Sequence, residues 1–92
     1  MQIRYAPLFY KMYKKLDVRI QNRFDQRIET FLKNPNAPSL NNHPLQREYE
    51  GKRSIDVTGD YRSIFYEEEI AGETVVNFTV IGTHDELYGP EN

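Results

Sequence analysis

Hydrophobic and polar residues repeat with two different periods along this chain, and the change of period separates a helical first half from a β-rich second half. Residues 2 to 6 alternate apolar and polar side chains, which predicts a short strand. From Pro7 to about Leu16, and again after Asp17, apolar residues recur every three or four positions, as on one face of a helix. Asp17 can cap the second helix through its carboxylate. The predicted apolar stripes are Leu8, Phe9, Met12, Tyr13 and Leu16 in the first helix and Ile20, Phe24, Ile28, Phe31 and Leu32 in the second.

The segment of residues 34–44 ends the helical pattern. It contains three prolines and four asparagines, a composition that predicts a connecting loop with no helix or strand of its own. β-Branched and aromatic residues then dominate three runs that are separated by turn residues, which is typical of a β-meander. The runs are residues 53–58, 61–69 and 74–82, with turns at Gly59-Asp60 and near Ala71-Gly72.

The order of elements predicts an α+β fold. Two N-terminal helices pack on an antiparallel sheet in the order β-α-α-β-β-β, and a polar C-terminal tail follows. A chain of 92 residues suits one core, so we expect residues 1–92 to form a single domain. The apolar sheet face that the helices cover is expected to hold Ile55 and Val57, Ile64 and Tyr66 or their alternates, and Val76, Phe78 and Val80.

Charge and cysteine content narrow the classes of protein. The absence of cysteine excludes a disulfide framework and any thiolate site. Charges interrupt the apolar residues near the N-terminus, so no signal peptide or membrane span is expected and the protein is expected in the cytoplasm. The net charge is −2, but residues 1–33 carry eight Lys or Arg against three acids, whereas residues 67–92 carry none against seven. A chain this bipolar can still present a basic surface to a polyanion.

The two histidines are the first candidates for chemistry. His43 and His84 both fall in polar, turn-rich segments at the borders of the predicted sheet rather than in an apolar stripe. A histidine side chain exchanges protons near neutral pH, so such a pair can act as acid and base, although both can equally be ordinary loop residues. Neither histidine lies in a metal-ligand motif and no glycine-rich phosphate loop occurs, so we expect no metal and no cofactor.

Cations and aromatic residues lie between and beside the histidines. RNA cleavage needs a base, an acid, cations for the phosphate and rings for stacked bases, and this region contains all four. Each residue also has a structural explanation. Arg53 and Arg62 can pair across strands with Asp56 or with the glutamates at 67–69, Asp60 suits a turn for backbone reasons, and the tyrosines can belong to the core. The candidate substrate-binding residues are Lys52, Arg53, Tyr61, Arg62 and Tyr88.

The arrangement as a whole resembles a known family. The stretch LNNHPLQREYEGKRSIDVTGDYRSIFY, followed by a strand and IGTHDELYG, is similar to the RelE/ParE superfamily of bacterial toxins and to its YafQ-like messenger-RNA endonucleases. The resemblance covers most of the chain and implies a RelE-like microbial RNase architecture. It also implies cleavage of messenger RNA on the ribosome, without metal, by attack of the 2′-hydroxyl on the adjacent phosphate. The family's site residues carry over by position to His43, Asp60, Tyr61, Arg62, His84 and Tyr88.

Two departures from the family pattern bear on activity. Asp56 stands where the YafQ-like branch has a histidine, so it serves either as the base or as an electrostatic partner for His43 or His84. The acidic total also differs from the usually basic toxins. Two other functions therefore remain open: a ParE-like inhibitor that binds DNA gyrase without catalysis, and an inactive toxin relic.

The resemblance also implies partners. They are a cognate antitoxin protein, the ribosome and messenger RNA, with no membrane and no direct DNA binding in the absence of the antitoxin. The acidic 67–73 hairpin is expected to receive basic residues of the antitoxin.

Overall fold

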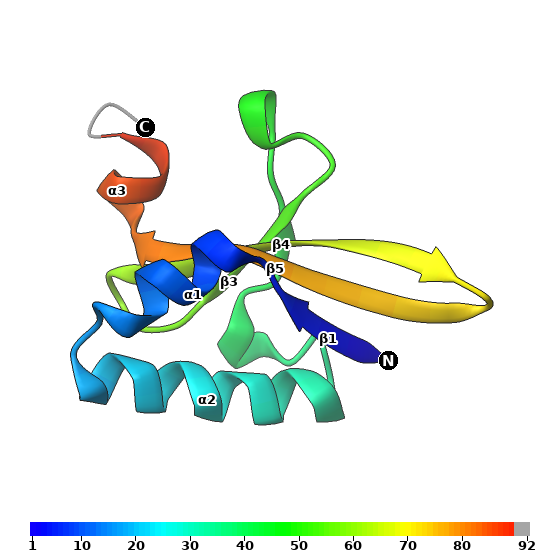
Figure 1. Cartoon of the computed structure of the whole chain (residues 1–92), viewed down its shortest axis with the longest axis horizontal. Coiled ribbons are helices and arrows are strands. Elements are labelled where there is room, and N and C mark those ends of the chain that lie inside the picture. The colour runs from blue at the N-terminus through cyan, green and yellow to red at the C-terminus, as the bar shows by residue number, and fades with distance from the viewer. Residues whose placement is uncertain (90–92) are drawn as a thin grey trace.

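A five-stranded mixed sheet forms the centre of the fold in the computed structural model, which describes residues 1–89 (Figure 1). The long β4–β5 hairpin supplies most of the sheet. β1 joins β5 in parallel, and the other neighbours are antiparallel. Across the sheet the strands are β1 (Gln2–Tyr5), β5 (Glu73–Thr83), β4 (Tyr61–Ile70), β3 (Arg53–Asp56) and β2 (His43–Pro44).

Two helices cover one face of this sheet, and local sequence signals set their limits. α1 (Pro7–Lys14) begins at a proline, whose missing N–H is not needed in a first turn. α2 (Val18–Lys33) begins after Asp17, whose carboxylate accepts a 2.8 Å hydrogen bond from the Arg19 backbone N–H. That hydrogen bond lowers the pKa of Asp17, because it favours the ionised carboxylate. The predicted cap is confirmed.

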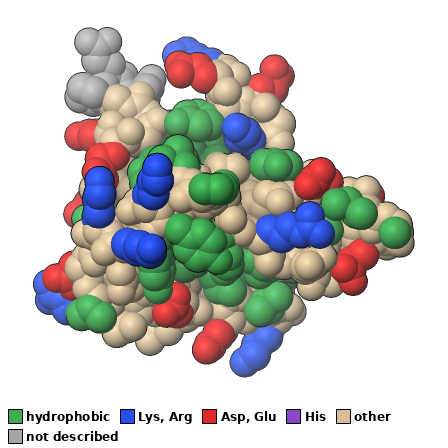
Figure 2. All heavy atoms as spheres, in the orientation of Figure 1, with side chains coloured by type: hydrophobic (Ala, Val, Ile, Leu, Met, Phe, Trp, Pro, Cys, Tyr) green, Lys and Arg blue, Asp and Glu red, His purple; other side chains and the backbone are tan. Residues whose placement is uncertain are grey.

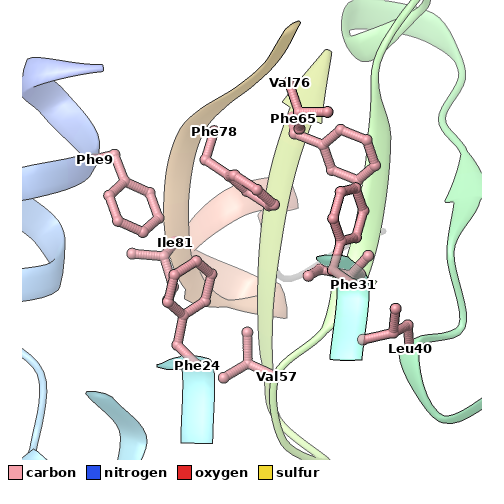
Figure 3. Close-up of a cluster of buried hydrophobic side chains, with 10 residues drawn as sticks. Phe9, Phe24, Phe31, Leu40, Val57, Phe65, Val76, Phe78 and Ile81 are labelled. Atoms are coloured by element: carbon pink, nitrogen blue, oxygen red, sulfur yellow. The ribbon is translucent and has the colours of Figure 1, made fainter. Parts of the chain in front are cut away.

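Phenylalanine forms the core between the helices and the sheet. All five phenylalanines are buried in one cluster, with Phe78 of β5 at its centre (Figure 3). The centroid of the Phe78 ring lies 5.1 Å from that of Phe65, 5.6 Å from Phe24 and 5.8 Å from Phe31. Tilted and edge-to-face rings at these distances attract one another beyond the burial of their area. The core therefore joins both helices to the sheet through contacts between rings.

The predicted α+β fold and its order of elements are confirmed, and the structure corrects several details. The sheet is mixed rather than wholly antiparallel, because β1 runs parallel to β5. Residues 34–44 are not free of structure: Pro38–Leu40 form a 3-10 turn (η1), and β2 adds an edge strand. The expected polar tail contains a short helix, α3 (His84–Tyr88), while residues 90–92 lie outside the described residues.

In each helix, one residue that was predicted to belong to the buried apolar face is exposed instead. Leu8 and Leu32 are 55% and 53% exposed, so their assignment to the core was wrong. The rings of Phe9, Phe24 and Phe31 fill the space over the sheet. Leu8, next to Phe9, and Leu32, next to Phe31, therefore face solvent.

A β-bulge explains a further difference in the sheet. Ile64 pairs with Val80 and Phe65 pairs with Phe78, so Thr79 is one extra residue in β5. The bulge reverses which side chains face the helices beyond it. Ile81 joins the core where Val80 was predicted, and of the two alternates in β4 it is Phe65 that faces the helices.

The β4–β5 hairpin projects beyond the rest of the molecule (Figure 1). Its exposed end holds Glu67, Glu68, Glu69 and Glu73, and Figure 2 shows acidic side chains along both edges of the projection. Lys and Arg side chains gather instead over the α1 side of the same view. On this face, the acidic end of the hairpin and the cations over α1 therefore lie apart. None of the helices in residues 1–89 is long enough and apolar enough to span a bilayer.

The central ring gives a test of the core. Phe78→Ala is expected to lower the free energy of unfolding by about 3–5 kcal/mol, because it removes buried area and leaves a cavity. Leu32→Ala is the matched control and is expected to change it by less than about 0.5 kcal/mol, since Leu32 is exposed. Urea unfolding followed by circular dichroism measures both, and equal effects of the two substitutions would contradict this description of the core.

Candidate active site

A pocket of about 520 Å³ lies on the sheet face opposite the core. Two segments that rise from the same side of the sheet border it: the loop around the 3-10 turn Arg47–Tyr49 (η2) and helix α3 (Figure 1). Its floor is the sheet, because Ser54 and Arg62 alternate along their strands with residues that face the helices. Its lining includes His43, Tyr49, Ser54, Arg62, His84 and Tyr88.

Strand pairing determines which residues meet on the floor. His43 of β2 lies opposite Ser54 of β3. One step along the sheet, Arg62 of β4 lies between Asp56 of β3 and Gly82 of β5. Residues from four strands, spread over forty positions of sequence, thus form two adjacent rows under the pocket.

Arg62 is held in a fixed orientation. Its Nε lies 2.9 Å from Asp56 Oδ1, and its Nη1 donates to the carbonyls of Thr58, Gly59 and Tyr61. No hydrogen bond donated by its Nη2 is found among residues 1–89. The cross-strand pairing considered for Arg62 is therefore present, and the electrostatic partner of Asp56 is Arg62 rather than a histidine.

His43 is oriented by the turn that precedes it. Its Nδ1 lies 2.7 Å from the Asn41 carbonyl oxygen, which can only accept, so Nδ1 carries the proton of that hydrogen bond and Nε2 is left to exchange a proton with a ligand. Arg53 stabilises the same turn through a 2.8 Å hydrogen bond from its Nε to Asn42 Oδ1. Asn41 adopts the left-handed conformation that asparagine tolerates.

His84 is placed by the start of α3. Thr83 and Glu86 form a capping box, in which the Thr83 hydroxyl accepts from the Glu86 N–H and the Glu86 carboxylate accepts from the Thr83 N–H. The His84 side chain is 46% exposed, and its ring centroid lies 4.7 Å from that of Tyr88. The first turn of α3 therefore presents an imidazole beside an aromatic ring.

Tyr49 ties the two walls of the pocket together. Its hydroxyl donates a 2.8 Å hydrogen bond to the Leu87 carbonyl, and its ring meets Tyr88 edge to face at 5.5 Å. Burial raises the pKa of Tyr49, with Tyr88 and Glu48 adding to the shift, so the phenol remains a donor at neutral pH. The η2 loop and α3 are thus connected above the floor.

Solved structures share this architecture across nearly the whole chain. YafQ from E. coli strain BL21(DE3) is 25% identical with a TM-score of 0.76, and the match covers 96% of this chain and 98% of that one. A chain of the E. coli DinJ-YafQ toxin-antitoxin complex is 27% identical with a TM-score of 0.69, and the match covers 96% of this chain and 97% of that one. A YoeB/ParE toxin from Agrobacterium tumefaciens is 17% identical with a TM-score of 0.74, covering 91% and 99%.

The chain has the fold of RelE/ParE-type toxins, and it is similar to YafQ at 25% to 27% identity. The resemblance inferred from the sequence, including its likeness to YafQ, is confirmed. No protein-family model matches the sequence, and no curated protein does.

The pocket gathers only part of the predicted site. His43, Arg62, His84 and Tyr88 line it. The other five candidates lie outside the lining. Asp56 pairs with Arg62, Arg53 donates to Asn42, and Lys52 lies over the Tyr49 ring. Tyr61 packs against the core, and Asp60 is exposed, with its backbone carbonyl accepting from the His84 N–H.

The sequence analysis missed the lining residues of the η2 loop, among them Tyr49, and it missed Ser54 on the floor. Tyr49 had a weak signal, since it is an aromatic residue in a loop of charged residues. Ser54 had none, because a serine that alternates with apolar residues in a strand is indistinguishable from any surface serine. Among residues 1–89, no group of three or more His, Cys, Asp or Glu is arranged to hold a metal ion.

Gly82 allows α3 to lie close to β5. A Cβ at this position would lie 3.1 Å from Glu86 Oε1 and 3.4 Å from Leu87 Cδ2. The contact with Glu86 involves the same carboxylate oxygen that caps the helix. A side chain at Gly82 therefore disturbs the cap and the packing that position His84.

Gly82→Ala is expected to cost about 1–3 kcal/mol of stability and to reduce the protection of α3 amides, because overpacking moves the helix. Hydrogen exchange measured by NMR or mass spectrometry reports the change. Gly59→Ala is the control, since a Cβ there meets nothing within 4 Å. Unchanged protection of α3 in Gly82→Ala would show that the close approach does not matter.

Removing the hydrogen bond from Tyr49 to Leu87, which tethers the η2 loop to α3, gives a pH-dependent test. Tyr49→Phe is expected to lower stability by about 0.5–1.5 kcal/mol at neutral pH, because the hydrogen bond to Leu87 is lost. The raised pKa of Tyr49 means that the tether is fully present below the ordinary tyrosine pKa of about 10 and is lost as pH rises through the higher folded value. Denaturation curves from neutral to alkaline pH measure this difference, with Tyr10→Phe as an exposed control. A difference that grows above pH 10 would contradict the assignment.

Proposed function

We propose that this chain is the toxin half of a type II toxin-antitoxin pair, and that it cleaves messenger RNA on the ribosome. The observation that carries the proposal is one pocket containing two histidines and an arginine from distant parts of the sequence. The 25% to 27% identity to YafQ over 96% of the chain supports it.

The chemistry needs a proton acceptor and a proton donor on opposite sides of a phosphate. The 2′-oxygen forms a bond to phosphorus while the bond from phosphorus to the 5′-oxygen breaks, which leaves a cyclic phosphate and a free 5′-hydroxyl. One histidine takes the 2′-hydroxyl proton, and the other gives a proton to the departing 5′-oxygen. His43, with its free Nε2, and His84, half exposed at the pocket wall, occupy positions suited to these roles.

The remaining residues bind the substrate. The fixed guanidinium of Arg62 offers Nη2 to the phosphate oxygens, whose charge grows in the transition state. Tyr88 and Tyr49 supply faces or edges on which a base can stack. No metal is required for this mechanism.

Asp56 lowers the charge that the pocket presents. Its ion pair cancels the charge of Arg62, and the chain as a whole carries −2. Affinity for free RNA depends on uncompensated Lys and Arg, so it is expected to be weak. A ribosome that holds the message in position would supply the missing affinity, which is why we propose ribosome-bound rather than free RNA as the substrate.

The expected partner is a small antitoxin in the same cytoplasm. One YafQ structure is a toxin-antitoxin complex with DinJ, and a similar complex is proposed here. The exposed glutamates of the β4–β5 hairpin are one surface that basic antitoxin residues can bind. Charge reversal at Glu67, Glu68 and Glu69 is expected to weaken the complex on that account.

Expression in bacteria tests the proposed activity. Wild type induced from a controlled promoter is expected to stop growth and to leave codon-phased cuts on translated messages, and His84→Ala is expected to abolish both because it removes one proton-transfer group. Glu29→Ala is the control, since Glu29 is an exposed residue of α2 that does not line the pocket. Mapping of RNA 5′ ends measures the cuts.

The same experiment separates the alternatives. Growth arrest without cuts, in wild type and His84→Ala alike, would point to a ParE-like action on gyrase, which needs no proton transfer. No arrest by soluble wild type would identify an inactive relic.

A further inference from the structure

Ser54 has a buried hydroxyl that the fold does not use. The side chain is fully buried, and its Oγ has no hydrogen-bond partner among residues 1–89. The other fully buried serine, Ser63, donates a 2.9 Å hydrogen bond to the Val80 carbonyl. A buried hydroxyl without a partner destabilises a protein, so its presence calls for an explanation outside the packing of the core.

The position of Ser54 points to a ligand. It lines the pocket, lies directly opposite His43, and sits one row from Arg62 on the floor. Arg62 also retains an Nη2 without a hydrogen-bond partner in residues 1–89. Ser54 and Arg62 thus line the same pocket from neighbouring strands, and each holds a donor without a partner among residues 1–89.

The chemistry of the surroundings favours an oxyanion. The lining includes Arg47, Arg62, His43 and His84 against one acid, Glu48. A serine hydroxyl donates one hydrogen bond, and a donated bond to an anion is shorter and stronger than one between neutral groups. Because the hydroxyl is buried, exclusion from water strengthens a hydrogen bond that it donates to a ligand.

We propose that Ser54 is a substrate-binding residue whose hydroxyl donates to a non-bridging phosphate oxygen beside Arg62. The inference rests on the proposed function for the identity of the substrate, a phosphodiester of RNA. It also makes a claim about the isolated protein, which is that the pocket floor binds inorganic phosphate through Ser54.

Two serine variants test the inference in the full chain. Ser54→Ala is expected to keep or raise the unfolding midpoint, because it removes an unsatisfied hydroxyl, while weakening inorganic phosphate binding about 10-fold to 100-fold. Ser63→Ala is the matched control: it loses a satisfied hydrogen bond on the other face of the sheet, so stability falls while phosphate affinity stays. NMR titration with inorganic phosphate and urea unfolding provide the two readouts.

The outcomes separate this inference from the proposed function. Loss of stability in Ser54→Ala with unchanged phosphate binding overturns it, because the hydroxyl is then structural, and so does a wild type that binds no phosphate at this site. Message cleavage by wild type and Ser54→Ala at equal rates overturns it while leaving the endonuclease proposal standing. Ser54-dependent phosphate binding in a protein that cleaves no message supports the binding site and removes the endonuclease.

Discussion

The contact of Phe78 with five other aromatic rings is the interaction on which the rest of the structure depends. Its neighbours are Tyr5 of β1, Phe9 of α1, Phe24 and Phe31 of α2, and Phe65 of β4. β1 and both helices therefore all contact one side chain near the middle of β5. A chain of 92 residues without disulfides has little other buried area to rely on, so this cluster decides where both helices lie.

Placement of both helices on one face leaves the opposite face for the pocket. Two backbone features at the end of β5 then complete it. The bulge at Thr79 reverses the inward and outward residues, and Gly82 lets α3 lie against the strand. Tyr49 connects α3 to the η2 loop by one hydrogen bond. The walls of the pocket are thus α3 and the η2 loop, whereas its floor is the sheet itself.

The charges follow the same division. Arg47, Arg62 and both histidines line the pocket, whereas exposed glutamates lie on the projecting hairpin. Asp56 lowers the positive charge of the pocket by pairing with Arg62. The pair also fixes the orientation of the Arg62 guanidinium. Asp56 therefore has two effects: it lowers the affinity of the pocket for free phosphate, and it orients the guanidinium that is proposed to bind the phosphate.

The sequence by itself determined the features that depend on neighbouring residues. The strand, the two helices, the Asp17 cap and the three-stranded meander follow from periodicity and turn chemistry, which act over a few positions, and the motifs around His43 and His84 indicated the toxin type. Only the tertiary structure decided the parallel pairing of β1 with β5, the exchange of Val80 for Ile81 in the core, the partner of Asp56, and the entry of Tyr49 and Ser54 into the pocket. These depend on which strands become neighbours and on a single extra residue in β5, and a shift of one residue in register moves every later side chain to the other face of the sheet.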